Sequence, residues 1–426
     1  MHRRQFPVAA AATLLAFLAL PTVGAAQDSG PFDLLVRGGR ILDGTGTTIE
    51  RGSVVVRGGQ ISSVTAGSTV AGVNEIDAQG MTVMPGFIDT HRHVIRSSSP
   101  LRSQQAMDRW LDEEAPVHMQ DYLDAGFTTI MSAGDSSLAI VELRERLDSG
   151  KLTGPRLFVS GDRIRKPTPE QLASCEANEF CRANNSLISN ADEARAKVRE
   201  LVAIGVDMVK IRLDRFNLTG IDKAILAAIA DEAKLAGVPS IVHATSVQDM
   251  IDAVEAGTTR LVHTPHTGAV AGTKGPQMVV DAGIPMSSTL GVWVPLFGEE
   301  NDLRWRNGAP FPPPGINRAG QGPINARLLW DAGVPIAYGT DTGFSAADSL
   351  AHELRPLQLL FSPQDIVAML TRHAASFLDL NDEIGTLAVG KDADIVIVDG
   401  DPLADIDAVL NVALVIQRGE IVADHR

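Results

Sequence analysis

The two ends of the chain share a pattern of short apolar runs separated by glycine-containing turns. Apolar runs broken by tight turns are typical of antiparallel β-strands. The expected strands are residues 34–41 and 53–61 near the start and residues 393–398 and 414–422 near the end. We therefore expect a small β-sandwich domain built from both ends, with residues 27–82 as its first part and residues 381–426 as its second. Two unrelated β-appendages are the alternative.

Between these ends, short β-branched runs alternate with amphipathic segments of helical length. Eight such units can be counted, and their strands are expected to begin near Val83, Thr128, Arg156, Met208, Ser240, Arg260, Pro285 and Pro335. Expected helices include residues 191–203, 222–236 and 346–360. Repeated βα units over residues 83–380 predict an α/β fold, a (β/α)8 TIM barrel. A doubly wound open sheet would give similar local signals.

The start of the chain has the pattern of a secretory signal peptide. Arg3 and Arg4 precede an apolar run over residues 6–20, and small residues follow as far as Ala26. Roughly 15 apolar residues at about 1.5 Å each are shorter than the ~30 Å hydrocarbon core, which disfavours a membrane anchor. The sequence therefore predicts cleavage of residues 1–26 and an exported mature protein, periplasmic or secreted, without a membrane segment.

Composition limits the partners. The chain has 426 residues, of which 44% are hydrophobic, and a formal net charge of −15. Nucleic-acid binding relies on clustered Lys and Arg, which this sequence does not show, so a nucleic-acid partner is disfavoured. The sequence points instead to a small-molecule substrate. It leaves a homo-oligomer open.

Two cysteines, Cys175 and Cys181, lie six residues apart. In an oxidising compartment such a pair can close a small loop by a disulfide. Two free thiols in a surface loop are the alternative, and a thiolate metal site is disfavoured because no further ligands lie nearby in sequence.

Residues capable of metal chemistry follow the expected strands. His91 and His93 end the first one, and side chains two apart on a strand point the same way, so both imidazoles can chelate one metal. In the fourth strand, Val209, Ile211 and Leu213 suit the helix-packed face, which turns Lys210 and Arg212 inward. A buried amine needs a cause: carbamylation, or an ion pair with Asp207 or Asp341.

Three more strands end in candidate ligands. His243 closes the fifth strand and His263 the sixth, although either alone is more often a hydrogen-bonded core histidine. His266 follows as a substrate-binding or supporting group. Asp341 closes the eighth strand, where a helix N-cap is the alternative role.

This order of ligands along the barrel resembles the binuclear amidohydrolase superfamily. The segments 85–89 (PGFID) and 384–394 (IGTLAVGKDAD) are similar to the family's transitions between barrel and β-domain. The resemblance implies two divalent metals, with zinc as the first choice and manganese or iron as alternatives. His91, His93 and Asp341 would hold one metal and His243 and His263 the other, while a carbamylated Lys210 and a hydroxide bridge them. Asp341 would also be the catalytic base.

The finer resemblance is to the imidazolonepropionase-like branch, which includes Xaa-Pro and Xaa-Arg dipeptidases. It implies hydrolysis of an amide or peptide carbon–nitrogen bond in a dipeptide or an N-acyl amino acid. Arg163, Arg165 and Arg212 are the candidates for binding a substrate carboxylate. The connections 161–190 and 291–321 are expected to shape the pocket.

One departure from that branch bears on specificity. Where some of those peptidases place a histidine after strand three, this sequence has Arg163 and Arg165. Cyclic amide or lactone hydrolysis, a mononuclear deaminase and a noncatalytic scaffold are therefore kept as alternatives.

Overall fold

The computed structural model describes residues 33–67, 74–96, 103–213, 221–293 and 315–426. The predicted signal peptide and most of the connection 291–321 lie outside these residues. No described helix is long and apolar enough to cross a membrane.

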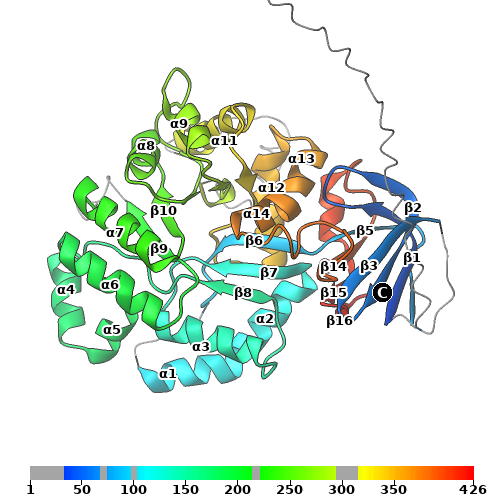
Figure 1. The fold of residues 1–426 in the computed structure, drawn as a ribbon, viewed down its shortest axis with the longest axis horizontal. Helices are drawn as coiled ribbons and strands as arrows, with labels where there is room; N and C mark the ends of the chain where they lie inside the picture. The colour runs from blue at the N-terminus through cyan, green and yellow to red at the C-terminus, as the bar shows by residue number, and fades with distance from the viewer. Residues whose placement is uncertain (1–32, 68–73, 97–102, 214–220, 294–314) are drawn as a thin grey trace, which may run out of the picture. The chain divides into compact units, whose positions relative to one another are not determined.

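Eight short parallel strands form the predicted barrel. They are β6 (Phe87–Arg92), β7 (Phe127–Ser132), β8 (Arg156–Val159), β9 (Val209–Leu213), β10 (Ser240–Ala244), β11 (Arg260–Val262), β12 (Met286–Ser287) and β13 (Ile336–Ala337). Figure 1 labels five of them, β6 to β10. Backbone hydrogen bonds close the ring: Ile164 donates to Lys210 at 2.7 Å, and Thr90 to Tyr338 at 3.0 Å. Because the first strand thus reaches the last, the structure is a closed barrel and the open-sheet alternative is wrong.

Helices connect these strands and pack around them. They are α1 (Gln104–Arg109), α2 (Ala115–Asp124), α3 (Ser137–Asp148), α4 (Pro169–Glu176), α5 (Glu179–Asn184), α6 (Ala191–Ala203), α7 (Lys223–Ala236), α8 (Val247–Glu255), α9 (Gly275–Asp281), α11 (Gly315–Asp331), α12 (Ala346–Gln358), α13 (Pro363–Ala368) and α14 (Ala374–Phe377). The prediction for residues 191–203 is confirmed as α6, whose N-cap Asn190 accepts from the backbone amides of Asp192 and Glu193.

The two chain ends form one domain, as the sequence predicts. Its strands are β1 (Leu34–Leu42), β2 (Thr48–Arg57), β3 (Gln60–Ala66), β4 (Glu75–Asp77), β5 (Met81–Pro85), β14 (Ile395–Asp399), β15 (Val412–Gln417) and β16 (Glu420–Asp424). In Figure 1 the blue strands of the chain's start lie beside the red segment of its end. All eight belong to one sheet, which bends so that Gln60 bridges Asp392, and the alternative of two separate appendages is wrong.

Both faces of this sheet are buried where it meets the barrel. Ile395 and Ile397 of β14 pack into the sheet domain's own core, whereas Val396 and Val398 pack into the barrel's core. Neighbouring side chains of a strand point to opposite faces, so a strand buried on both sides reads as a continuous apolar run. This explains the uninterrupted sequence 395–398 and ties the domain to the barrel.

The first barrel strand begins later than the sequence predicts. Val83 lies in β5 of the sheet domain, and the barrel strand β6 starts at Phe87. The break falls at Gly86, where an added Cβ would lie 2.2 Å from Oγ1 of buried Thr128. The chain therefore needs a glycine at this point to cross from one sheet into the other beside β7.

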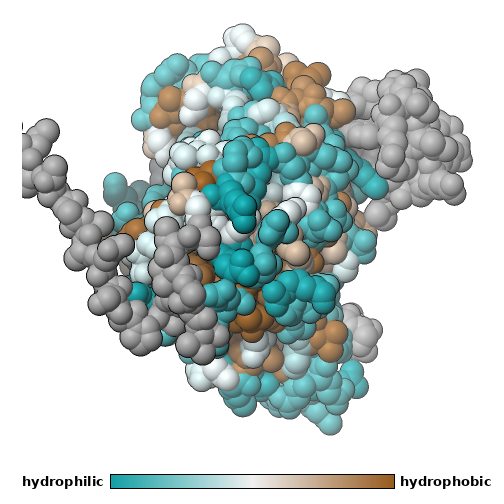
Figure 2. All heavy atoms as spheres, turned by 90° about the vertical axis from the view of Figure 1, so that its right-hand side faces the viewer, coloured by the Kyte–Doolittle hydropathy of each residue, from teal (hydrophilic) through white to brown (hydrophobic). Residues whose placement is uncertain are grey.

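The molecular face that carries the sheet domain shows hydrophobic side chains scattered among hydrophilic ones (Figure 2). Val389 and Ile421 are exposed hydrophobic residues of this domain. Singly exposed apolar residues are normal in soluble proteins, so they do not argue for a partner.

Replacing Gly86 by Ala should destabilise the protein, because the new methyl group overlaps Thr128 and buried overpacking typically costs about 1–3 kcal/mol. Thermal unfolding measures the effect. Gly320→Ala is the matched control, since nothing lies within 4 Å of its added Cβ in α11, and it should unfold no earlier than the wild type. Equal unfolding temperatures for the two variants would contradict the close approach at Gly86.

Candidate metal centre

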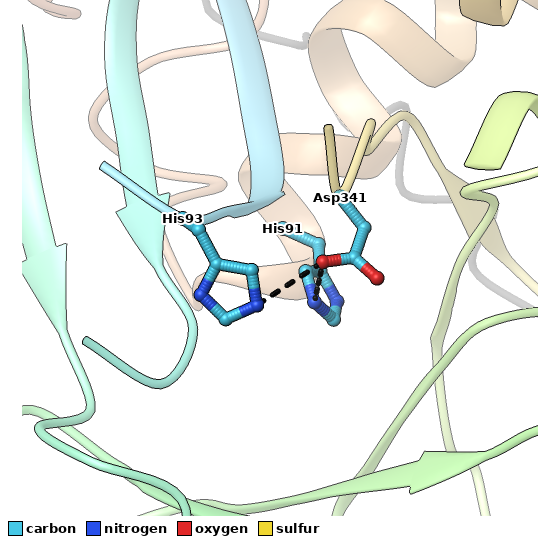
Figure 3. A group of neighbouring side chains, drawn as sticks. All are labelled: His91, His93 and Asp341. Carbon is cyan, nitrogen blue, oxygen red and sulfur yellow. Dashed lines mark ion pairs between the residues drawn. The ribbon is translucent and has the colours of Figure 1, made fainter. Parts of the chain in front are cut away.

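Three predicted ligands form a compact group at the carboxyl ends of the barrel strands. His91 lies near the end of β6, His93 just follows it, and Asp341 follows β13 (Figure 3). Oδ1 of Asp341 lies 3.3 Å from Nε2 of His91 and 3.2 Å from Nε2 of His93. Two imidazoles and a carboxylate at these distances can hold one divalent cation.

The other three predicted ligands adjoin this group. Nζ of Lys210 lies 3.2 Å from Nε2 of His91, and Nε2 of His263 lies 2.7 Å from Nδ1 of His243. Nε2 of His263 is also 3.8 Å from Oδ2 of Asp341. The structure thus brings all six residues together in one place.

The strand ends are shaped locally to present these side chains. His263 has φ +74° and Asp341 has φ +50°, both in the left-handed region that residues other than glycine rarely adopt. The backbone amide of Asp341 donates to the carbonyl of His91 at 2.8 Å, which links two ligands directly. Asp341 is not a helix N-cap, because Ser345 caps α12.

Burial keeps three of the imidazoles neutral. It lowers the pKa of His91 to about 4 and that of His243 to about 3, and the nearby Lys210 cation adds to both shifts. Burial, with the facing His243, also holds the pKa of His263 well below its usual range. Metal coordination requires neutral imidazoles, so these histidines are ready for it at neutral pH.

His93 and Asp341 behave differently because they face each other. Although burial lowers the pKa of His93, its contacts with Asp135 and Asp341 outweigh burial and raise that pKa to about 9. Burial alone would raise the pKa of Asp341, but the facing His91 and its hydrogen bonds with His91 and His93 hold it well below the usual range. Asp341 is therefore ionised at neutral pH, the state in which a carboxylate binds a cation.

Lys210 faces the centre of the barrel, as strand alternation predicts. It is 2% exposed, while Val209 and Ile211 pack into the hydrophobic core. Burial, with smaller contributions from the cations of Arg163 and Arg212, outweighs the attraction of Asp341 and lowers the pKa of Lys210 to about 7. Asp207 is not its partner, because the Asp207 carboxylate binds Arg144 at 2.9 Å.

This donor set fits divalent cations. Ring nitrogens of His243 and His263 are hydrogen-bonded at 2.7 Å, and the Asp341 carboxylate lies near three of the four imidazoles. Imidazole and carboxylate donors suit zinc, manganese or iron. A neutral amine at Lys210 can add carbon dioxide, which would supply the further anionic oxygens that two neighbouring cations need.

Two supporting residues were missed by the sequence analysis. Asp135 accepts hydrogen bonds from Ser132 Oγ at 2.6 Å and Val94 N at 2.7 Å, and it lies 3.5 Å from Nδ1 of His93. Its position just after β7, at the carboxyl end of a barrel strand, was an available signal. Thr289, 2.6 Å from Nδ1 of His263, gave none, because a threonine after a two-residue strand looks ordinary.

The four substrate-binding candidates have different surroundings. Arg163 lies near His93, since Gly134 separates their side chains, and among the described residues it forms no ion pair. Arg212 is close enough to lower the pKa values of Lys210 and His243. Arg165 binds Asp162 at 2.8 Å. The buried ring of His266 lies 4.7 Å from that of Trp293, between their centroids.

Arg165 lies beside the loop that the cysteines close. Cys175 of α4 and Cys181 of α5 form a disulfide, so of the two possibilities left open by the sequence, the disulfide is the one that the structure has. Arg165 also donates to Oδ1 of Asn185 at 3.3 Å, and a cavity of about 450 Å³ lies beside this loop, lined partly by Asp162 and Cys181. The cation of Arg165 is therefore used to hold the loop.

A closed barrel whose strand ends present histidines and an aspartate defines a metal-dependent hydrolase. The chain belongs to the amidohydrolase family, whose model matches residues 82–422.

Relatives of several activities are similar over most of the chain. An imidazolonepropionase from Caldanaerobacter subterraneus subsp. tengcongensis is 24% identical over 82% of this chain and 84% of that protein. A 5-methylthioadenosine/S-adenosylhomocysteine deaminase from Haloarcula marismortui is 23% identical over 87% and 85%. Among solved structures, a prolidase complexed with N-methylphosphonate-L-proline has a TM-score of 0.76 and 26% identity, covering 92% of this chain and 99% of that one.

Replacing His93 by Ala should weaken metal binding, because the first cation loses one of its imidazoles. Zinc added to the metal-stripped wild type at about 100 times its Kd should stabilise the fold by about 2.7 kcal/mol, measured by thermal unfolding. The variant should need more zinc for the same shift. His425→Ala, at an exposed position near the chain end, should respond as the wild type does. Identical zinc responses of both variants would argue against this centre.

Proposed function

We propose that the protein hydrolyses an amide or peptide carbon–nitrogen bond in a small substrate that carries a carboxylate, such as a dipeptide or an N-acyl amino acid. The observation that carries this proposal is the half-buried cation of Arg163, which lies beside His93 and near Lys210. A buried cation is stabilised by an anion that binds next to it, and a guanidinium pairs with a carboxylate through two parallel hydrogen bonds. The similar prolidase supports the same substrate class.

In the proposed hydrolysis, Asp341 transfers the proton and Arg163 binds the substrate. Two divalent cations, zinc by preference, would activate water and polarise the substrate carbonyl when bound. Asp341, ionised and adjacent to His91 and His93, accepts the proton of the attacking water. It then returns that proton to the leaving amine. Arg163 holds the substrate carboxylate and so fixes which bond faces Asp341.

Lys210 is proposed to act as a carbamate. Its neutral amine would add carbon dioxide, forming a nitrogen–carbon bond and releasing one proton. The new carboxylate would lie between the group of His91, His93 and Asp341 and the pair of His243 and His263. The 3.2 Å contact of Nζ with His91 and its position beside the His243–His263 pair support this placement. The formal charge at this position would change from 0 for the neutral amine to −1 for the carbamate, which suits two cations held by neutral imidazoles.

We also propose that the protein is exported. The signal-peptide pattern of residues 1–26 supports export, and the Cys175–Cys181 disulfide is of the kind that persists in oxidising compartments.

Lys210→Ala should abolish hydrolysis, because the cations lose the anion between them. Added short carboxylates such as formate or propionate should restore part of the rate, measured with the substrate found below. Lys234→Ala on the exposed side of α7 is the control and should keep full activity. A Lys210→Ala enzyme that keeps its rate would contradict the carbamate.

Arg163→Met should raise KM for substrates with a free carboxylate and leave their carboxamide analogues unaffected. Losing a hydrogen-bonded ion pair of this kind costs about 1.5–3 kcal/mol, or about 10–150-fold in kcat/KM. The measurement is hydrolysis of a panel of dipeptides, N-acyl amino acids and their amides by the zinc-loaded protein. Arg165→Met is the matched control, because its side chain holds the disulfide loop; it should lower stability and leave the carboxylate preference unchanged. Deamination of nucleosides with no activity on the panel would instead favour a deaminase.

A further inference from the structure

Three neighbouring barrel strands, β11, β12 and β13, end in the same unusual way. Shortly after each strand, a single residue has a left-handed backbone conformation: His263 has φ +74°, Thr289 has φ +46° and Asp341 has φ +50°. Two of these three are candidate metal ligands. Thr289 is the third, and neither its residue type nor the proposed mechanism accounts for it.

A left-handed conformation is especially costly for threonine, because its Cβ is branched. Such strain persists only where the surroundings enforce it, and it concentrates at functional sites. The backbone amide of Thr289 donates to the carbonyl of Gly339 at 3.0 Å, and that of Ser288 donates to Ala337 at 2.9 Å. Strand pairing with the segment before Asp341 thus continues through the strained residue.

Glu353 holds the chain on both sides of Thr289. This residue of α12 is 1% exposed, and its carboxyl group accepts from Ser288 Oγ at 2.6 Å, Leu290 N at 2.8 Å and Gly291 N at 2.5 Å. The adjacent His352 donates from Nε2 to the carbonyl of Gly291 at 2.8 Å. A buried group with three donors from one short segment fixes the path of residues 288–291.

This path brings the Thr289 hydroxyl to one metal ligand. Oγ1 lies 2.6 Å from Nδ1 of His263, whose Nε2 faces His243 and Asp341. When the hydroxyl accepts the Nδ1 proton, the lone pair of His263 must lie on Nε2, the atom that faces the other donors. A hydrogen-bond partner of this kind sets both the tautomer and the orientation of a ligating imidazole.

We propose that Thr289 is a positioning residue for the cation held by His243 and His263, and that Glu353 maintains the strained backbone that this role requires. The inference rests on the proposed metal centre. According to this inference, the strained backbone of Thr289 increases the affinity for metal and lowers the stability of the fold.

Zinc titration of the metal-stripped protein tests the role of Thr289 without any substrate. Thr289→Val keeps the shape and loses the hydroxyl, so the weaker of the two zinc sites should lose about 10–100-fold in affinity. Thr289→Ser keeps the hydroxyl and should stay close to the wild type. Thr289→Gly removes both hydroxyl and strain, so it should bind zinc as poorly as Thr289→Val yet unfold at a temperature no lower than that variant.

A double-mutant cycle tests the link to Glu353. The amide nitrogen of Glu353→Gln cannot accept a hydrogen bond, so this change should also weaken zinc binding, and its effect should largely vanish in the Thr289→Val background. Zinc affinities of Thr289→Val equal to the wild type would overturn the inference and leave the metal centre standing. Fully additive losses would overturn the role of Glu353. A wild type that binds no zinc would overturn the proposed function as well.

Discussion

The site depends on the close approach of buried nitrogen groups: three neutral imidazoles and a lysine amine are packed together in the centre of the barrel. Nε2 of His263 and Nδ1 of His243 are 2.7 Å apart, and Nζ of Lys210 is 3.2 Å from His91. Buried polar groups normally face a complementary partner, and here burial has suppressed protonation of three imidazoles. Cations bound between these donors would use nitrogen lone pairs that carry no proton, so the low pKa values of the imidazoles favour metal binding.

The backbone that presents these groups is strained, and this strain limits the length of the barrel strands. Strands β11, β12 and β13 have only three, two and two residues of regular strand, and the three left-handed residues follow directly or soon after them. A left-handed residue turns the chain out of the pleat, so the regular strand stops before it even where single backbone hydrogen bonds, such as that of Thr289 to Gly339, continue. The strands with the least regular hydrogen bonding are therefore those that present His263, Thr289 and Asp341. Compensation comes from outside the ladder, through groups such as the buried carboxyl of Glu353.

The features that could be predicted from the sequence are those that repeat along the chain. Strand alternation is periodic, so it placed Lys210 inward, and the βα repeat placed all six candidate ligands at one end of the barrel. Features that depend on a single close approach were not accessible: the break at Gly86 depends on Thr128 across the sheet, and Thr289 depends on a carboxyl 64 positions later in the chain. The roles of Arg163 and Arg165 also needed coordinates, because only their neighbours distinguish a cation beside the centre from one that binds Asp162.

The contrast between these two arginines bears on how specificity can change in such a barrel. Arg165 is fixed by Asp162, Asn185 and, through the loop, by the disulfide, so its replacement would disturb the fold around α4 and α5. Arg163 has no comparable structural partner among the described residues, and burial lowers its pKa, which shows that its charge is poorly solvated there. A side chain that costs stability and supports no contact is free to vary without loss of the fold. Under the proposed function, a carboxylate of the substrate is the group that would stabilise this poorly solvated cation.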